Sequence, residues 1–418
     1  MSAAAAGGLA RRLGVGDAVV IGLGSMIGAG VFAAFTPAAA AAGAGLLLGL
    51  AVAAVVAYCN ATSSARLAAL YPESGGTYVY GRERLGEFWG YLAGWGFVVG
   101  KTASCAAMAL TVGNYAVPGH TRPVAVVAVV ALTTLNYFGV QKSAWLTRLI
   151  VAVVLGVLAG VALACFAGDH PRADNLTPLT GHGIVDVLQA AGFLFFAFAG
   201  YARIATLGEE VRDPARTIPR AIPLALGVTL AAYATIAVAV LAVLGSARVA
   251  STPDPLAAAV TSGSWTWMEP IVRIGAVVAS VGSLLSLLLG VSRTSLAMAR
   301  DRHLPTVLAA VHPRYRVPHR AELAVGAVVI AVVLTADVRG AIGFSSFAVL
   351  VYYAIANASA LTLDRSRGTR LIPVLGLAGC LLVAVTLPAA SSLTGTAVLI
   401  AGTLLWAVRR VARSRSGR

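Results

Sequence analysis

Two glycine-bearing stretches lie inside long apolar runs, where an uninterrupted helix would otherwise form. The first, at residues 22–32 (GLGSMIGAGVF), holds four glycines, and the second, at residues 190–203 (AAGFLFFAFAGYAR), carries Gly200. A glycine inside a helix costs about 1 kcal/mol relative to alanine, so four close together favour unwinding. The spacing of Gly24 and Gly28 also suits close helix packing, but two such stretches five apolar runs apart favour a pair of broken helices.

Unwound backbone has a definite chemistry. Its N–H and C=O groups lack partners within the helix, and inside a membrane such groups must line a cavity and meet a ligand. Free N–H groups at the start of a helix suit a carboxylate, and free carbonyl oxygens suit an ammonium group. The two breaks therefore predict a binding site for a small polar molecule in the middle of a helical bundle.

Lys101 is the other residue with a chemical signal. It lies near the centre of the apolar run 88–117, about 15 Å from either surface of a hydrocarbon core roughly 30 Å thick. Its helical neighbours Phe97, Ser104 and Cys105 form a mixed face that suits the protein interior. Two roles stay open for Lys101: proton exchange during function, or a structural ammonium group that holds the carbonyls of a broken helix.

The composition indicates which elements position these residues. Of 418 residues, 59% are hydrophobic and 11% charged, whereas a soluble domain has roughly 25% charged residues, so a water-soluble enzyme is excluded. At about 20 residues per crossing, we expect an all-α integral membrane protein with about 12 transmembrane helices. The apolar runs that fit are 16–42, 44–69, 88–117, 123–140, 146–168, 184–207, 219–246, 270–299, 321–336, 340–363, 371–389 and 392–409.

The basic residues orient these helices. If the chain crosses the membrane at each apolar run, successive loops lie on alternate sides. Most of the 31 lysines and arginines then fall on one side, and the loops of the other side hold only Arg122, Arg172, Arg248 and Arg339. Since cytoplasmic loops carry the excess of basic residues, we expect a multi-pass protein of the cell membrane with both termini in the cytoplasm. The net charge of +15 lies at the ends of apolar runs, so the expected partner is the lipid bilayer and not nucleic acid, with no obligate protein partner evident.

Other function classes find little support in the sequence. The apolar runs contain no histidine and no central acid, so we expect no catalytic residue, no cofactor and no enzyme activity. His303, His312 and His319 lie nine and seven residues apart on a proline-broken stretch, a spacing that does not suit a metal ion. A channel would need a filter motif in place of two separate breaks, and a non-transporting sensor on the same scaffold remains open.

Four blocks of sequence carry a family likeness: GLGSMIGAGVF (22–32), YPESGGTYVYGRERLGEFWGYLAGW (71–95), GEEVRDPARTIPRAI (208–222) and GVSRTSLAMARDRHLPTVLAAVHPRYRVPHRAEL (290–323). In order and spacing they resemble the amino acid–polyamine–organocation superfamily of permeases, across the first ten apolar runs. The resemblance implies the leucine-transporter-type fold, with helices 1 and 6 broken. Its parts would be a cytoplasmic tail at 1–15, a first repeat of five helices at 16–168, an inverted second repeat at 184–363, two peripheral helices at 371–409 and a basic cytoplasmic tail at 410–418.

The resemblance also implies a substrate held at the bilayer midplane between the first and sixth helices. A zwitterionic amino acid would satisfy both kinds of free backbone group. Phe196 or Phe198 would close over it as an aromatic gate, or would serve ordinary bundle packing. The expected substrate-binding residues are Ser25, Met26, Ile27, Gly28, Ala29, Gly30, Phe196, Ala197, Phe198, Ala199 and Gly200.

Three positions depart from relatives that move cations or protons. Ala202 stands where an acid follows the sixth-helix break in cationic amino acid exchangers, and Gly100 stands near the third-helix acid of cationic transporters. Val154 stands where proton-coupled members have a fifth-helix lysine. A cationic side chain would meet no carboxylate, so we expect a secondary transporter of neutral amino acids, proton-coupled, with Lys101 as the coupling candidate.

Several alternatives stay open. An exchanger, or an importer of amines or polyamines, would also use broken helices, because carbonyls and aromatic faces hold cations. Sodium coupling would need an oxygen site, for which Ser283 and Ser286 are candidates, although serines in helices commonly bond to their own backbone. Arg203, Glu209 and Glu210 are candidates for a cytoplasmic gate, or form a plain solvated charge cluster.

Overall fold

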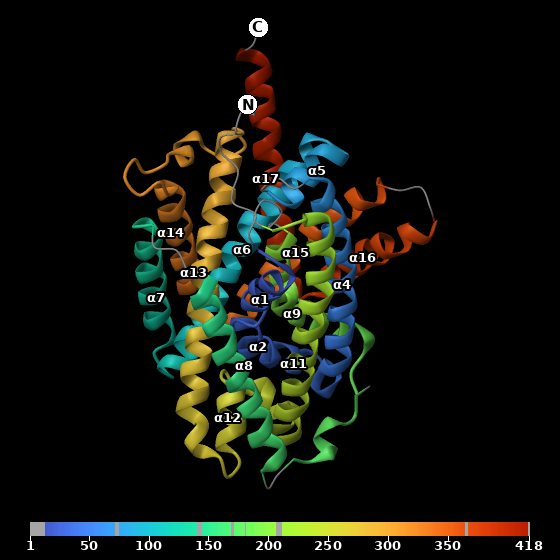
Figure 1. The fold of residues 1–418 in the computed structure, drawn as a ribbon, viewed down its shortest axis with the longest axis vertical. Coiled ribbons are helices and arrows are strands. Elements are labelled where there is room, and N and C mark those ends of the chain that lie inside the picture. The colour runs from blue at the N-terminus through green and yellow to red at the C-terminus, as the bar shows by residue number, and fades with distance from the viewer. Residues whose placement is uncertain are drawn as a thin grey trace.

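Helices make up the regular secondary structure of the part of the chain that the computed structural model describes (Figure 1). A lone parallel bridge between Leu13 and Val211 is the only strand-like pairing among these residues. The all-α class expected from composition is therefore confirmed. The described residues are 13–71, 75–139, 144–168, 171–179, 181–205, 211–363 and 367–416.

The helices follow the expected apolar runs. Nine stretches of the described residues are long and apolar enough to cross a membrane. The remaining runs form α7, α14 and α16; α7 and α14 have 17 residues each, at the lower limit for a crossing helix, so the count of twelve crossings stays a prediction. The bounds in chain order are α1 Val15–Met26, α2 Ala29–Ala33, α3 Phe35–Ala42, η1 Gly43–Gly45, α4 Leu46–Leu70, α5 Thr77–Leu85, α6 Glu87–Ala116, α7 Thr121–Tyr137, α8 Ala144–Ala167, η2 Ala173–Leu176, α9 Ile184–Phe198, η3 Ala199–Tyr201, α10 Ala202–Ala205, α11 Pro214–Ser251, α12 Pro255–Thr261, η4 Thr266–Met268, α13 Glu269–Arg300, η5 Thr306–Ala309, α14 His319–Thr335, α15 Val338–Leu361, α16 Arg367–Thr386 and α17 Ala389–Ser416.

The first apolar run contains the first break. α1 ends at Met26 and α2 begins at Ala29. The two residues between them are not helical, with φ −80° and ψ 67° at Ile27 and φ −122° and ψ −137° at Gly28. Helical dihedral angles at Ala34 then join α2 to α3, so one short interruption separates two helical halves.

The sixth apolar run contains the second break. α9 ends at Phe198, the 3-10 turn η3 follows, and the four-residue helix α10 comes next. A 3-10 turn bonds to i+3 in place of i+4, so the α-helical pairing is interrupted here. The two breaks lie against each other in the middle of the bundle, where α1 contacts η3 and α2 contacts α9 (Figure 1).

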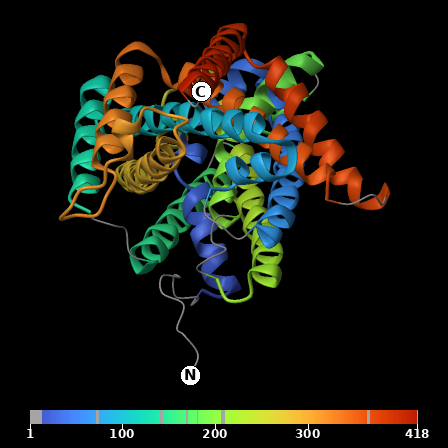
Figure 2. The same ribbon diagram turned by 90° about the horizontal axis from the view of Figure 1, so that it is seen from above.

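Four helices, α6, α7, α13 and α14, share an apolar core that is separate from the main one. Figure 2 shows α7, α13 and α14 (teal, gold and orange) gathered on one side of the molecule. The main core holds the broken helices together with α4, α11 and α15. We call α6, α7, α13 and α14 the four-helix unit; its buried core residues are Cys105, Ala106, Ala109, Leu110, Ala125, Val129, Leu132, Leu284, Leu288, Val291, Val325, Val329 and Val333.

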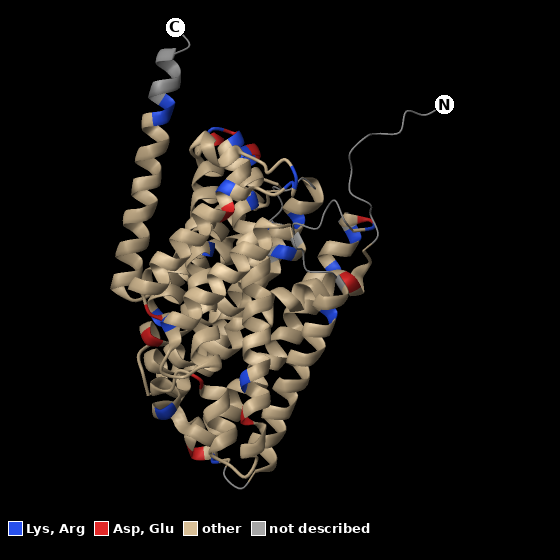
Figure 3. Ribbon diagram, turned by 90° about the vertical axis from the view of Figure 1, so that its left-hand side faces the viewer, with Lys and Arg blue, Asp and Glu red and all other residues tan. Residues whose placement is uncertain are grey.

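Charged residues lie mostly toward the two ends of the bundle, and most of the ribbon between them is uncharged (Figure 3). Large apolar side chains on the outside include Val127, Leu163 and Leu404, each more than 60% exposed. An apolar exterior of this kind is unfavourable in water and favourable in lipid. The arrangement fits a protein embedded in a membrane.

Candidate functional site

The two breaks touch at positions where only glycine fits. A Cβ atom on Gly30 of α2 would lie 2.6 Å from the Cα atom of Ala197 in α9. A Cβ atom on Gly200 would overlap with the backbone carbonyl group of Ser25 in α1. Backbone lies against backbone at both contacts, so the glycines serve close approach as well as unwinding.

Tyrosine hydroxyl groups from other helices bind the carbonyl oxygens that unwinding frees. The Tyr233 hydroxyl of α11 lies 2.6 Å from the carbonyl oxygen of Met26 and 3.1 Å from that of Ala197, so it reaches both breaks. The Tyr353 hydroxyl of α15 donates to the carbonyl oxygen of Ala199 at 3.4 Å. Both tyrosines are buried. Because an unsatisfied buried carbonyl costs about 1–3 kcal/mol, these hydroxyls stabilise the broken conformation.

Sequence reasoning did not single out Tyr233 or Tyr353. The available signal was weak: a tyrosine inside an apolar run must find a hydrogen-bond partner for its hydroxyl. Tyr91 and Tyr115 carry the same signal, yet they donate to the carbonyl oxygens of Gly402 and Phe32. Only the three-dimensional arrangement separates the tyrosines of the breaks from those that join other helices.

Replacement of Tyr233 with phenylalanine is expected to weaken substrate binding about tenfold, because the Ala197 carbonyl oxygen loses this donor at a cost of about 1–3 kcal/mol, whereas the Met26 oxygen keeps the Gly28 amide. Equilibrium binding of the substrate to the purified protein measures this. Tyr58→Phe is the matched control, since Tyr58 is 46% exposed on α4. Equal affinities in the two variants would show that Tyr233 does not support the breaks.

Lys101 of α6 lies beside the second break. Its side chain is 7% exposed, and its Nζ atom donates to the carbonyl oxygen of Ala199 at 3.4 Å, the same acceptor that Tyr353 uses. Among the described residues, Lys101 forms no ion pair with a carboxylate. The carbonyl contact fits a structural ammonium group and the burial fits proton exchange, so both roles remain open.

The two candidate gate phenylalanines have different surroundings. Phe198 is fully buried, and its ring meets the Tyr233 ring edge-on at 5.2 Å between centroids. Phe196 is 8% exposed, and no ring contact is described for it. Because Phe198 is packed against the tyrosine that joins the breaks, Phe196 is the better candidate for a gate.

The two serines expected near a cation differ in their bonding. Ser286 donates to the carbonyl oxygen of Gly282 in its own helix at 3.0 Å. Ser283 is buried, its Oγ atom has no hydrogen-bond partner among the described residues, and a Cβ atom on Gly28 would overlap with it. Ser283 therefore faces the first break with an unpaired hydroxyl, whereas the Ser286 hydroxyl donates within its own helix and keeps its oxygen lone pairs.

The expected cytoplasmic gate is described in part, since Glu209 and Glu210 lie outside the described residues. Arg203 is exposed on α10. Asp301 accepts a hydrogen bond from the Tyr78 hydroxyl of α5 at 2.5 Å and pairs with Arg82 at 3.6 Å. Burial, together with the Asp301 carboxylate, raises the pKa of Tyr78. Asp301 thus ties α5 to the end of α13.

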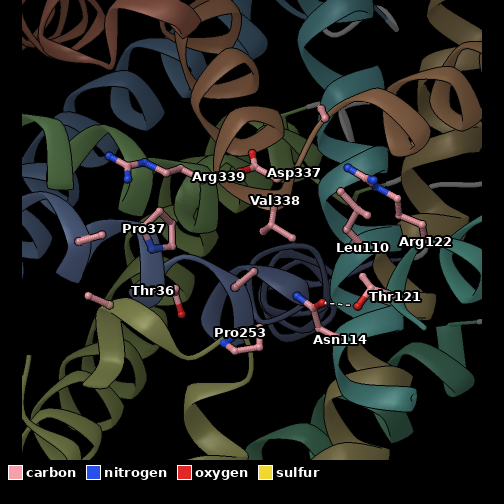
Figure 4. Close-up of a pocket in the computed structure, with 14 residues that line it drawn as sticks. Thr36, Pro37, Leu110, Asn114, Thr121, Arg122, Pro253, Asp337, Val338 and Arg339 are labelled. Carbon is pink, nitrogen blue, oxygen red and sulfur yellow. Dashed lines mark hydrogen bonds between the residues drawn. The ribbon is translucent and has the colours of Figure 1, made fainter. Parts of the chain in front are cut away.

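A cavity of about 390 Å³ lies at the end of α2 that is farther from the break. Arg122 and Arg339 stand on two sides of it, and Asn114 accepts from the Thr121 hydroxyl at 2.8 Å in its wall (Figure 4). Ala33, the last residue of α2, also lines it, so about one helical turn separates the cavity from the first break. Its lining residues are Ala33, Thr36, Pro37, Ala40, Leu110, Asn114, Thr121, Arg122, Ala250, Pro253, Ala336, Asp337, Val338 and Arg339.

The paired breaks, with a cavity next to one of them, form an arrangement suited to binding a small polar solute within a membrane. Residues 13–408 match the model of a family described as amino acid permease. The chain belongs to this amino acid permease family. The resemblance seen in the four sequence blocks is thereby confirmed. The members of this family that are named here are transporters, which fits the expectation that the chain is not an enzyme.

Three relatives show the range of the permease family. An uncharacterized transporter of Mycobacterium tuberculosis is 68% identical over 98% of this chain and 93% of its own length. A branched-chain amino acid permease of Bacillus subtilis is 29% identical over 74% of this chain and 72% of its own length. A cationic amino acid transporter of Homo sapiens is 28% identical over 85% of this chain and 60% of its own length.

Proposed function

We propose that this permease is a secondary active transporter that moves neutral amino acids across the cell membrane by alternating access, coupled to protons. The contact between the two broken helices is the main support. The amide groups of Ala29 and Gly30 in the first turn of α2 suit a carboxylate, and the carbonyl groups of residues 196–200, some of which already accept from Tyr233, Tyr353 and Lys101, suit an ammonium group. Both termini lie in the cytoplasm in this proposal, and Phe196 closes over the substrate.

The charges around the breaks support a neutral side chain on the substrate. Lys101 is the charged residue that contacts the second break, and an ammonium group there repels a cationic side chain. One relative is named a branched-chain amino acid permease and another a cationic amino acid transporter, so cationic amino acids are the second candidate. Arg203, Glu209 and Glu210 are proposed to close the cytoplasmic end.

Uptake by the purified permease in liposomes tests the substrate class and the coupling together. Labelled isoleucine uptake is expected to exceed labelled arginine uptake at least about tenfold, a difference of about 1.4 kcal/mol, and to rise with an inward proton gradient. Protein-free liposomes are the blank. Arginine uptake equal to or above isoleucine uptake would assign the cationic class.

Two further arms of this experiment separate the modes of coupling. Uptake that ignores the proton gradient but needs amino acid inside the liposome would show exchange. Uptake that disappears when sodium is replaced with potassium would show sodium coupling and would draw attention to Ser283. Absence of uptake for both amino acids would contradict the proposed function and favour amines.

A further inference from the structure

A buried carboxyl group outside the breaks forms no ion pair with the described part of the chain. Glu322 lies in the first turn of α14 and is 3% exposed. Neither of its carboxyl oxygens has a hydrogen-bond partner among the described residues, and no ion pair of these residues includes it. An isolated carboxylate is strongly unfavourable away from water, and such a group takes up a proton instead.

The helix opposite Glu322 offers acceptors. Gly326, one turn further along α14, packs against Thr133 of α7, since a Cβ atom there would lie 2.8 Å from the Thr133 hydroxyl oxygen. Asn136 lies three residues further along the same face of α7. Its amide nitrogen donates a hydrogen bond to the carbonyl oxygen of Leu285 at 3.3 Å. The Thr133 hydroxyl and the Asn136 amide oxygen have no partner among the described residues. The polar groups that α7 presents toward α14 are therefore unpartnered in this conformation within the described structure, as the Glu322 carboxyl oxygens are.

The charged groups around Glu322 do not neutralise it directly. Arg293 of α13 acts on the carboxyl through its charge, and the Ser292 hydroxyl lies near enough to favour the ionised form as well, but Arg293 is exposed. Ser292 donates to the carbonyl oxygen of Leu289. On its own helix, His319 and Arg320 precede Glu322 by three and two residues.

The other described elements packed against α14 carry charged or titratable groups that interact elsewhere or with His319. On α7, the Tyr137 ring meets the His319 ring at 6.1 Å, and His312 of the preceding loop meets it at 5.3 Å. On α6, Glu87 contacts His303 and Lys101 contacts a break carbonyl. The turn η5 (TVLA) carries no charged side chain.

The position of Glu322 places it at one end of the four-helix unit. Val325 and Val329, one and two turns further along α14, belong to the core of that unit. Its neighbour Ser292 lies nine residues from Ser283 on α13, about 14 Å along the helix, and Ser283 faces the first break. Glu322 is therefore linked to the breaks through α13 and lies toward the end of the molecule that is cytoplasmic in the proposed orientation.

We propose that Glu322 is a proton-binding site of this permease, separate from Lys101, that is protonated in the conformation described and exchanges its proton with the cytoplasm. On release, the proton passes to water as hydronium, and the carboxylate that remains is attracted to Arg293 of α13. The ligand is the proton alone. The transport readout of this proposal rests on the proposed function, whereas the stability readout does not.

The stability test compares the pH dependence of the unfolding midpoint of the purified full-length protein, from about pH 5 to about pH 9. The folded protein holds a proton that the unfolded chain releases, so raising the pH favours unfolding. The midpoint of the wild type is expected to fall by a few degrees more than that of Glu322→Gln, which cannot ionise. Glu83→Gln is the matched control, because Glu83 is an exposed acid of α5, and it should follow the wild type. Parallel curves for the wild type and Glu322→Gln would overturn the proposal.

The transport test uses liposomes with a fixed external pH and a varied internal pH. Wild-type isoleucine uptake is expected to rise severalfold as the internal pH is raised, because proton release becomes easier, and Glu322→Gln is expected to show no rise. A rise that Glu322→Gln retains would contradict the proposal. If the wild type transports no amino acid, the proposed function fails, and the stability curves still decide the question of Glu322.

A second variant keeps the test open if Glu322→Gln does not fold. Arg293→Gln leaves the carboxyl in place and removes the charge that favours its ionised form. The loss of stability begins in both proteins where the carboxyl of the unfolded chain ionises, and in Arg293→Gln it is expected to continue to a higher pH than in the wild type. A curve identical to that of the wild type would overturn the proposal.

Discussion

Uptake is expected to fall below detection when Gly200 is replaced with alanine. The added Cβ atom would overlap with the carbonyl group of Ser25 and lie 2.7 Å from the backbone nitrogen of Met26. These are backbone atoms that no side-chain rotation can clear, so α1 and the second break must move apart. A binding site must hold its groups within about 0.5 Å of the productive geometry. We therefore expect the initial rate of uptake to fall at least about 100-fold. Initial rates of isoleucine uptake in liposomes measure it.

Gly227→Ala is the control for Gly200→Ala. Gly227 lies within α11, and a Cβ atom there would meet nothing within 4 Å. Alanine inside a helix is more favourable than glycine by about 1 kcal/mol, so this variant should transport normally. Gly200→Ala that transports as well as Gly227→Ala would show that the close contact of the breaks is dispensable.

Lys101→Gln is expected to abolish the stimulation of uptake by an inward proton gradient, while amino acid binding persists within about tenfold. Glutamine keeps a donor that can reach the Ala199 carbonyl oxygen but carries no exchangeable charge. Uptake is measured with and without the gradient for the same preparation. Lys142→Gln, which removes the only other lysine of the sequence, serves as the control and should keep the stimulation.

Lys101→Arg separates the two roles that remain open for Lys101. Arginine keeps the positive charge and the donors but does not lose its proton in proteins. Loss of gradient stimulation in both Lys101→Gln and Lys101→Arg supports proton exchange by Lys101. Stimulation that survives in Lys101→Gln would make Lys101 a structural ammonium group, and the coupling proton would then reside elsewhere.

The two helix breaks could be predicted from sequence because glycine acts locally. Four glycines in one apolar run, and Gly200 in another, weaken the helices in which they lie, whatever surrounds them. The all-α membrane class could be predicted from composition for a similar reason, because insertion of a helix into a membrane depends on the hydrophobicity summed over a segment of about 20 residues and not on single contacts. The number of membrane crossings could not be predicted in this way, because α7 and α14 have 17 residues each, which is near the minimum length of a transmembrane helix.

The partners of the breaks could not be predicted, because they depend on contacts between distant segments. Tyr233 is 207 residues from Met26, and nothing in its own neighbourhood distinguishes it from the other buried tyrosines. For Glu322 the sequence indicates only an acid in the first turn of a helix, a position that is commonly solvated and favoured by the helix dipole. Packing by α7 and α13 buries it to 3% exposure, a result of tertiary structure alone.

The Tyr233 hydroxyl lies within hydrogen-bond distance of two carbonyl oxygens, one from each break, and a phenol has a single proton to give. At any instant one oxygen receives it and the other keeps an open lone pair. The carbonyl oxygens of Met26 and Ala197 therefore compete for one hydroxyl proton, and the Met26 oxygen also accepts from the Gly28 amide at 2.8 Å. In the proposed site, an ammonium group bound at one of these oxygens would commit the tyrosine hydroxyl to the other oxygen, so binding at one break would change the hydrogen bonding of the other.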